Sequence, residues 1–151
     1  MPTPHSCLLR RGRCSEPERI YLLTSTTDRR RPLFHDFHSA RLVIRHFRQA
    51  DLENNCQTLA WVVMPDHVHW LIELKEATLG ALMRRFKSRS SHALRKPGER
   101  ASPVWQVGYH DRALRRDEDV VKVARYIIYN PVRAGLVSKI GDYPHWDAVW
   151  L

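Results

Sequence analysis

Three stretches of the chain have the apolar, β-branched and aromatic character of buried β-strands. They are Ile20–Thr27, Cys56–Met64 and His67–Leu74, and polar or turn-forming residues bound each of them. Only Pro65 and Asp66 separate the second stretch from the third, which leaves room for nothing longer than a tight turn. The pattern therefore predicts one isolated strand followed later by a β-hairpin.

Two other stretches show the three- and four-residue spacing of amphipathic helices. Residues 35–50 carry apolar side chains at Phe37, Ile44 and Phe47, with polar residues between them. The second stretch has the same spacing at Leu79, Leu82, Met83, Phe86, Ser90, Ala93 and Leu94. Basic residues occupy the rest of the second helix, so we expect both helices to dock by one face.

The remaining elements are shorter. Residues 96–103 contain Pro and Gly and are predicted to be a loop, and residues 104–107 resemble a short strand. Acidic residues 117–119 mark the start of a helix over 120–130, and Pro131 marks its end. The order strand, helix, strand, strand, helix, strand, helix predicts a ferredoxin-like α+β sandwich: an antiparallel sheet with helices on one face, plus a C-terminal helix.

Size and composition are those of one packed domain. The chain has 151 residues and 43% are hydrophobic, which excludes a disordered basic tail. No apolar run approaches the roughly 20 residues that span a bilayer. Residues 1–17 are predicted to be a flexible basic arm and residues 18–151 the domain. The cysteines, Cys7, Cys14 and Cys56, fit no common zinc or redox spacing, so we expect reduced thiols in the cytoplasm.

Positive charge is concentrated in two segments. The chain has 25 Lys and Arg against 16 Asp and Glu, a net charge of +9. Residues 1–50 carry a net charge of +6 and residues 77–116 one of +8, whereas residues 51–76 carry −4 and residues 117–151 carry −1. Most of the bases are Arg, whose guanidinium binds phosphate in a bidentate manner. This favours a nucleic-acid partner over a merely solvated cationic surface.

His67 and His69 are the first candidate site residues. Positions i and i+2 of a strand project from the same face, so both imidazoles could reach one divalent cation while Val68 faces the other way. Such a pair is alternatively a feature of a strand's surface or edge. The apolar neighbours favour a site, because two imidazoles buried without partners would be costly.

Tyr126 and Asn130 are the second candidate pair. On a helical projection Tyr126 lies away from the apolar face of its helix, so it is not an obvious core residue. Asn130 follows one turn later on the same side, and the two side chains could converge on a neighbouring site. The alternative is a Tyr packed flat on the surface and an Asn that caps the helix before Pro131.

Four segments resemble a known family in order and spacing. They are RIYLLTSTTDRRRPLF, WVVMPDHVHWLIEL, WQVGYHDRALR and ARYIIYNPVRAGLV. Together they resemble the single-tyrosine HUH transposases and, among these, the REP-associated tyrosine transposases, which are relatives of IS200-type transposases. The likeness covers residues 19–137.

The resemblance implies a ferredoxin-like fold whose central strand carries the two His residues. It implies that His67, His69 and Asn130 bind a divalent metal, Mg or Mn, and that Tyr126 is the nucleophile. Tyr129 also precedes the Asn-Pro pair, but Tyr126 matches the first Tyr of the family pattern.

The implied activity is that of a metal-dependent single-stranded DNA endonuclease and strand transferase. Tyr126 would attack the phosphorus of a hairpin or palindromic repeat DNA, giving a 5′-phosphotyrosine and a free 3′-OH. A 3′-OH could then attack the phosphotyrosine and rejoin strands without ATP. We expect such a protein in the bacterial cytoplasm, on the nucleoid and not on a membrane, as a monomer or homodimer.

The basic segments are expected to hold DNA phosphates in that activity. The candidate residues are Arg10, Arg11, Arg13, Arg29, Arg30, Arg31, Arg84, Arg85, Lys87 and Arg89. Trp70 and Trp105 could stack on unpaired bases, but aromatic residues in apolar runs are more often core. Two alternatives remain: a domesticated hairpin-binding protein that no longer cuts, and a metal-dependent hydrolase.

Overall fold

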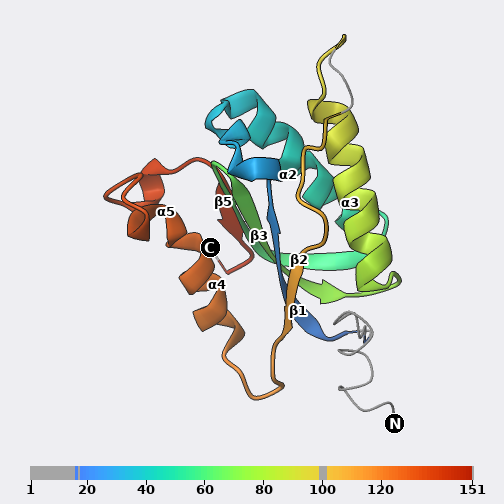
Figure 1. The fold of residues 1–151 in the computed structure, drawn as a ribbon. Coiled ribbons are helices and arrows are strands. Elements are labelled where there is room, and N and C mark those ends of the chain that lie inside the picture. Colours follow the sequence, from blue (N-terminus) through green and yellow to red (C-terminus); the bar gives the residue numbers. More distant parts are fainter. Residues whose placement is uncertain (1–15, 17, 99–101, 151) are drawn as a thin grey trace.

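The computed structural model describes residue 16 and residues 18–98 and 102–150 (Figure 1). The strands are β1 (Ile20–Thr26), β2 (Cys56–Met64), β3 (His67–Leu74), β4 (His110–Ala113) and β5 (Trp146–Ala148). The helices are α2 (Phe37–Leu52), α3 (Leu79–Leu94), α4 (Val120–Ile128) and α5 (Asn130–Arg133). Both strands of the predicted hairpin and the helix α3 have the bounds expected from their patterns.

The five strands form one antiparallel sheet in the order β4-β1-β3-β2-β5. The first four strands in this order follow the ferredoxin-like topology, and β5 extends the sheet beyond β2. Strand β3 is therefore central. Its register sets His67 opposite Thr26 and Met64, and His69 opposite Thr24 and Val62.

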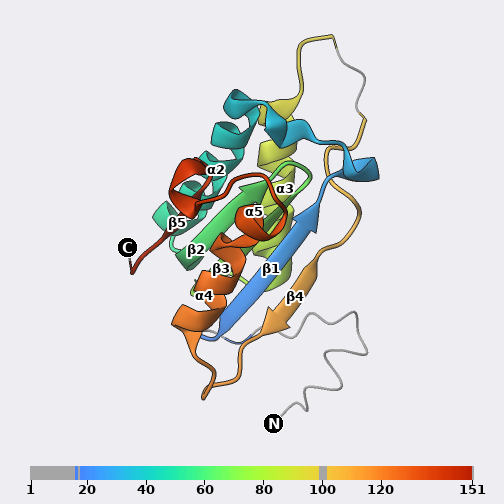
Figure 2. The same cartoon turned by 90° about the vertical axis from the view of Figure 1, so that its left-hand side faces the viewer.

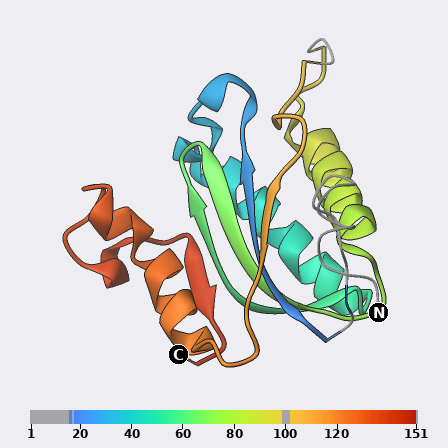
Figure 3. The same cartoon turned by 60° about the horizontal axis from the view of Figure 1, so that its bottom comes forward.

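Helices cover both faces of the sheet (Figures 1, 2 and 3). Helices α2 and α3 pack on one face around Phe47, Trp70 and Phe86, whose rings contact one another. Helix α4 packs on the other face through Ala124 and Ile127. The sandwich with an added C-terminal helix is confirmed, and that helix covers the face opposite α2 and α3.

Side-chain caps fix where the helices begin. Asp36 accepts from the backbone N of Ser39 at 3.0 Å at the start of α2, and Thr78 caps α3 in the same way. Asp119 accepts from the N of Lys122 at 3.2 Å, so the acidic segment does begin α4. Helix α4 ends at Ile128, as Pro131 suggested, but Pro131 itself lies in the first turn of the further helix α5.

The predicted strand at 104–107 is wrong. Val104 and Trp105 are apolar because they are buried in the core, and Trp105 makes only an isolated bridge to Thr27. Gly108, at φ 81°, then turns the chain into β4, which pairs with β1. No helix in the described parts of the chain is long and apolar enough to cross a membrane.

Candidate active site

His67 and His69 lie side by side on the sheet face that α4 covers. Their ring centroids are 4.9 Å apart and the rings are nearly perpendicular, at 81°. Val68 between them is 1% exposed and belongs to the core on the other face. The predicted alternation is therefore confirmed, and the two imidazoles share one face at the start of β3.

Each imidazole has its Nδ1 atom engaged by a neighbour. The Nδ1 of His67 lies 2.7 Å from Oδ1 of Asp66, and the Nδ1 of His69 lies 2.8 Å from Oγ1 of Thr24. A carboxylate only accepts, so the Nδ1 of His67 donates. In the neutral tautomer that this contact favours, the lone pair is on Nε2. Partners of this kind fix the tautomer and orientation of metal-binding imidazoles.

Asp66 also binds a cation. Its Oδ2 accepts from Nε of Arg30 at 3.1 Å. Burial alone would raise the pKa of this carboxyl, but the hydrogen bonds and charges of His67 and Arg30 outweigh it and lower the pKa below its ordinary value. Arg30 therefore stabilises the carboxylate that orients His67.

The imidazole of His69 is neutral at physiological pH. Burial, with smaller contributions from the charges of His67 and Arg133, lowers its pKa from 6.5 to about 4. A neutral imidazole is the form that binds metals.

This shift predicts a pH-dependent stability. His69 is protonated near pH 6.5 in the unfolded state but only near pH 4 in the folded state. Its contribution therefore leaves the folded state unaffected above pH 6.5 and destabilises it as the pH falls from 6.5 towards 4. Between pH 7 and pH 5 the free energy of unfolding should fall by about 2 kcal/mol from this group. Denaturant unfolding in EDTA measures the change. His145, whose pKa burial also lowers, adds to it.

His69→Gln is the control for this experiment. It removes the contribution of His69 but keeps that of His145, so its stability should fall less between pH 7 and pH 5. Equal pH profiles for the variant and the natural sequence would contradict the burial of a neutral His69.

Tyr126 and Asn130 lie on the two C-terminal helices over the same sheet face. Tyr126, in α4, is 65% exposed, as its position away from the apolar face predicted. Tyr129 is the C-cap of α4 and is 43% exposed. Asn130 begins α5, which lies over the face of the sheet that carries the imidazoles (Figure 2).

Arg133, which the sequence analysis did not single out, links these residues. Its Nη2 donates to the backbone O of Tyr126 at 2.5 Å and to Oδ1 of Asn130 at 3.1 Å. Its Cζ lies 3.9 Å from the centroid of the Tyr126 ring. Its position three residues after Asn130 and seven after Tyr126 is the signal that could have identified it.

The donor set around the imidazoles fits a divalent cation that takes part of its shell from water and phosphate. Within the described residues, no three His, Cys, Asp or Glu side chains are grouped to hold a metal ion. A third protein ligand in these parts of the chain would therefore be another oxygen donor, such as the amide of Asn130 that the resemblance implies. The Oδ1 of Asn130 retains one lone pair beside the hydrogen bond from Arg133, and amide oxygen suits Mg and Mn.

The predicted DNA-binding residues divide into several groups. Arg10, Arg11 and Arg13 lie outside the described residues. Arg29 is exposed, whereas Arg31 donates to the backbone O of Pro103 at 2.6 Å. In the basic segment of residues 1–50, Arg29 is therefore exposed to solvent, whereas Arg31 links its loop to Pro103.

The basic residues of α3 lie across the sheet from the imidazoles. Arg84 and Arg85 are exposed. Lys87 donates to the backbone O of Gln106 at 2.9 Å, and Arg89 pairs with Glu53 at 2.8 Å. Since α3 covers the opposite face, the part of a DNA molecule that contacts these residues lies away from His67 and His69. Trp70 and Trp105 are buried, as expected of core residues.

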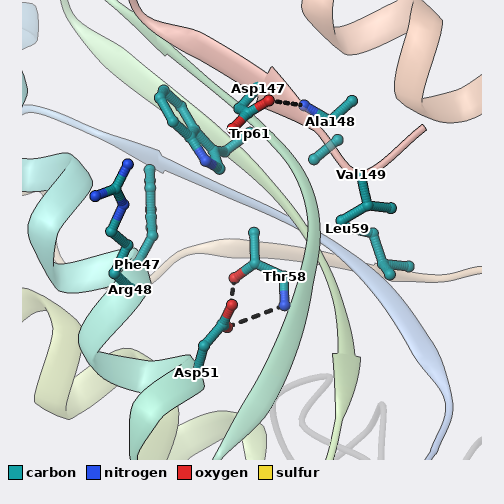
Figure 4. A pocket seen from close by; sticks show the side chains of 10 residues that line it. Phe47, Arg48, Asp51, Thr58, Leu59, Trp61, Asp147, Ala148 and Val149 are labelled. Atoms are coloured by element: carbon teal, nitrogen blue, oxygen red, sulfur yellow. Dashed lines mark hydrogen bonds between the residues drawn. The ribbon is translucent and has the colours of Figure 1, made fainter. Parts of the chain in front are cut away.

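A hollow at the β2–β5 edge contains none of the candidate residues. It has a volume of about 300 Å³, and α2, β2 and β5 line it (Figure 4). Asp51 in its wall accepts from the backbone N of Thr58 at 3.0 Å and from its Oγ1 at 2.7 Å. The candidate residues are thus on the sheet face that α4 covers and not in this hollow.

Comparison with known proteins identifies similar sequences and folds. Residues 18–130 match the family described as "Transposase IS200 like". A Haemophilus influenzae protein, itself a candidate REP-associated tyrosine transposase, is 29% identical over 118 residues, which are 68% of this chain and 66% of that protein. The REP-associated tyrosine transposase of Escherichia coli is 30% identical over 87 residues, which are 56% of this chain and 50% of the Escherichia coli protein. The chain therefore spans between half and two thirds of these curated relatives.

A solved structure has a similar fold. It is a REP-associated tyrosine transposase bound to a REP hairpin, and it aligns with a TM-score of 0.70 and 24% identity. The alignment covers 89% of this chain and 79% of the other.

Proposed function

Because the chain belongs to the IS200-like transposase family, we propose that it nicks and rejoins single-stranded DNA with Tyr126 as the nucleophile. One observation carries this proposal: the exposed phenol of Tyr126 lies over the same sheet face as the imidazoles of His67 and His69, whose orientations are fixed by hydrogen bonds. Thr24 and Asp66 hold the two imidazoles, and Arg133 links Tyr126 to Asn130 on the helices over that face.

His67, His69 and Asn130 would hold Mg or Mn. When bound, such an ion polarises a non-bridging phosphate oxygen and stabilises the leaving 3′ oxygen. The protein's own residues do the rest. The exposed Tyr126 presents its hydroxyl to the DNA, its oxygen bonds to phosphorus, and the bond from phosphorus to the 3′ oxygen breaks.

The proposed substrate is a hairpin with a single-stranded flank. Support comes from the relative that was solved with a REP hairpin. The exposed cations Arg29, Arg84 and Arg85 offer phosphate contacts, which give affinity rather than sequence choice.

A denaturing gel of the protein incubated with end-labelled hairpin DNA and Mn²⁺ tests this proposal. We expect a labelled species of protein mass that survives SDS and disappears with EDTA. Retarded DNA in a native gel with no covalent species would indicate the non-cutting binding protein. Cleavage without any covalent species would indicate hydrolysis by water.

The partners of the imidazoles yield a separate prediction. Thr24→Val removes the hydroxyl group that contacts the Nδ1 of His69, and Asp66→Asn weakens the hydrogen bond to the Nδ1 of His67. Each should lower the affinity for Mn²⁺ by about 10- to 100-fold, as measured by isothermal titration calorimetry.

Thr26→Val is the matched control. Thr26 lies on the same strand opposite His67, and within the described part of the chain its side chain donates to no imidazole. Its affinity for Mn²⁺ should be unchanged. An equal loss in Thr24→Val and Thr26→Val would show that the hydrogen bond to His69 does not orient a ligand.

A further inference from the structure

Arg133 brings a positive charge to the point where the proposed nucleophile and the proposed amide ligand meet. The guanidinium is stacked on the Tyr126 ring, with 3.9 Å from Cζ to the ring centroid. One nitrogen, Nη2, makes both hydrogen bonds, to the backbone O of Tyr126 and to Oδ1 of Asn130. The charge of Arg133 also contributes to the lowered pKa of His69.

Most of the hydrogen-bonding capacity of Arg133 is unused. A guanidinium has five N–H groups, and the two contacts above take only those of Nη2. In the residues that the structure describes, no acceptor engages its Nε or Nη1, and the side chain is exposed. The free N–H groups therefore point to an anionic ligand from outside the chain.

We propose that Arg133 is a catalytic residue that binds a non-bridging oxygen of the scissile phosphate through Nε and Nη1. This inference rests on the proposed function. During attack, the Tyr126 oxygen forms a bond to phosphorus while the bond to the 3′ oxygen breaks. The phenolic proton passes to solvent, and the leaving oxygen takes up a proton from solvent. The non-bridging oxygens carry negative charge in the transition state, and a guanidinium fixed at that position stabilises it.

Three variants of Arg133 separate charge stabilisation from packing. Arg133→Met keeps the aliphatic stem and loses the charge, Arg133→Lys keeps the charge, and Arg133→Ala leaves space for an added cation. The readout is the rate of covalent adduct formation in a single turnover at saturating hairpin DNA and Mn²⁺. Lys139→Met, which removes another exposed cation of the C-terminal segment, is the matched control.

We expect Arg133→Met to slow adduct formation by about 100-fold relative to the natural protein. Arg133→Lys should be about 10-fold faster than Arg133→Met. Free guanidinium ion should accelerate Arg133→Ala in a saturable manner and should not accelerate Tyr126→Phe. The melting temperature should stay within a few degrees of that of the natural protein, because Arg133 is exposed. Because DNA and Mn²⁺ are saturating, a change in affinity for either does not enter the measured rate.

Two results would overturn the proposal. One is an Arg133→Met rate within about 3-fold of the natural rate. The other is a slow Arg133→Lys together with no rescue by guanidinium, which would assign the loss to packing against Tyr126. In both cases the natural protein still forms the adduct, so the proposed function stands. Absence of any adduct with the natural protein would instead refute the proposed function, and the role of Arg133 with it.

Discussion

Tyr126→Phe is expected to abolish the covalent protein–DNA species, with a loss on the order of 10⁴-fold or more in the rate of nicking. The substitution removes one oxygen, and that oxygen is the proposed nucleophile. The ring is 65% exposed and contributes no packing to the core, so the fold should be unaffected. The measurement is the rate of adduct formation on labelled hairpin DNA in the presence of Mn²⁺.

Tyr129→Phe is the matched control for this variant. It makes the same chemical change three residues away, at the C-cap of α4. Its nicking rate should stay near that of the natural protein, and both variants should bind hairpin DNA with unchanged affinity. Loss of the adduct in Tyr129→Phe, with Tyr126→Phe active, would exchange the roles of the two tyrosines.

Replacing either imidazole is expected to have the second-largest effect. His67→Ala and His69→Ala each remove one proposed metal ligand and should lower the affinity for Mn²⁺ by more than about 100-fold, which exceeds the loss expected for a partner of a ligand. Nicking at 1 mM or lower Mn²⁺ should then be undetectable. Calorimetric titration and the nicking assay measure the two effects separately.

His92→Ala is the control for this pair. His92 is an exposed His on α3, which packs on the sheet face opposite His67 and His69. It should bind Mn²⁺ and nick DNA as the natural protein does. If His67→Ala and His69→Ala kept the metal affinity of the natural protein, the two imidazoles would have a structural role only.

The parts of the fold that depend on local pattern could be predicted from the sequence. The β2–β3 hairpin follows from two apolar runs separated by two residues, α3 from helical spacing and the start of α4 from a capping acid. All of these signals are local. Strand β4 could not be predicted in this way. Its residues are polar because it is an exposed edge strand held by backbone pairing to β1, and the neighbouring buried Trp105 gave a stronger apolar signal.

The candidate site shows the same division. The shared face of His67 and His69 follows from a two-residue spacing, and the exposure of Tyr126 follows from helical periodicity. Thr24 is different, because it reaches His69 across 45 residues of sequence through the β1–β3 register. The pairing of Arg89 with Glu53 spans 36 residues in the same way. Such contacts depend on tertiary pairing, which no local pattern records.

Mass spectrometry of the trapped protein–DNA species identifies the side chain that acts as the nucleophile. The natural protein is incubated with hairpin DNA and Mn²⁺, denatured, and digested with nuclease and protease. We expect the nucleotide mass on the phenolic oxygen of Tyr126 and on no other residue. A nucleotide attached to Tyr129 or to any other side chain, or DNA that is cleaved with no attached nucleotide, would show that Tyr126 is not the nucleophile.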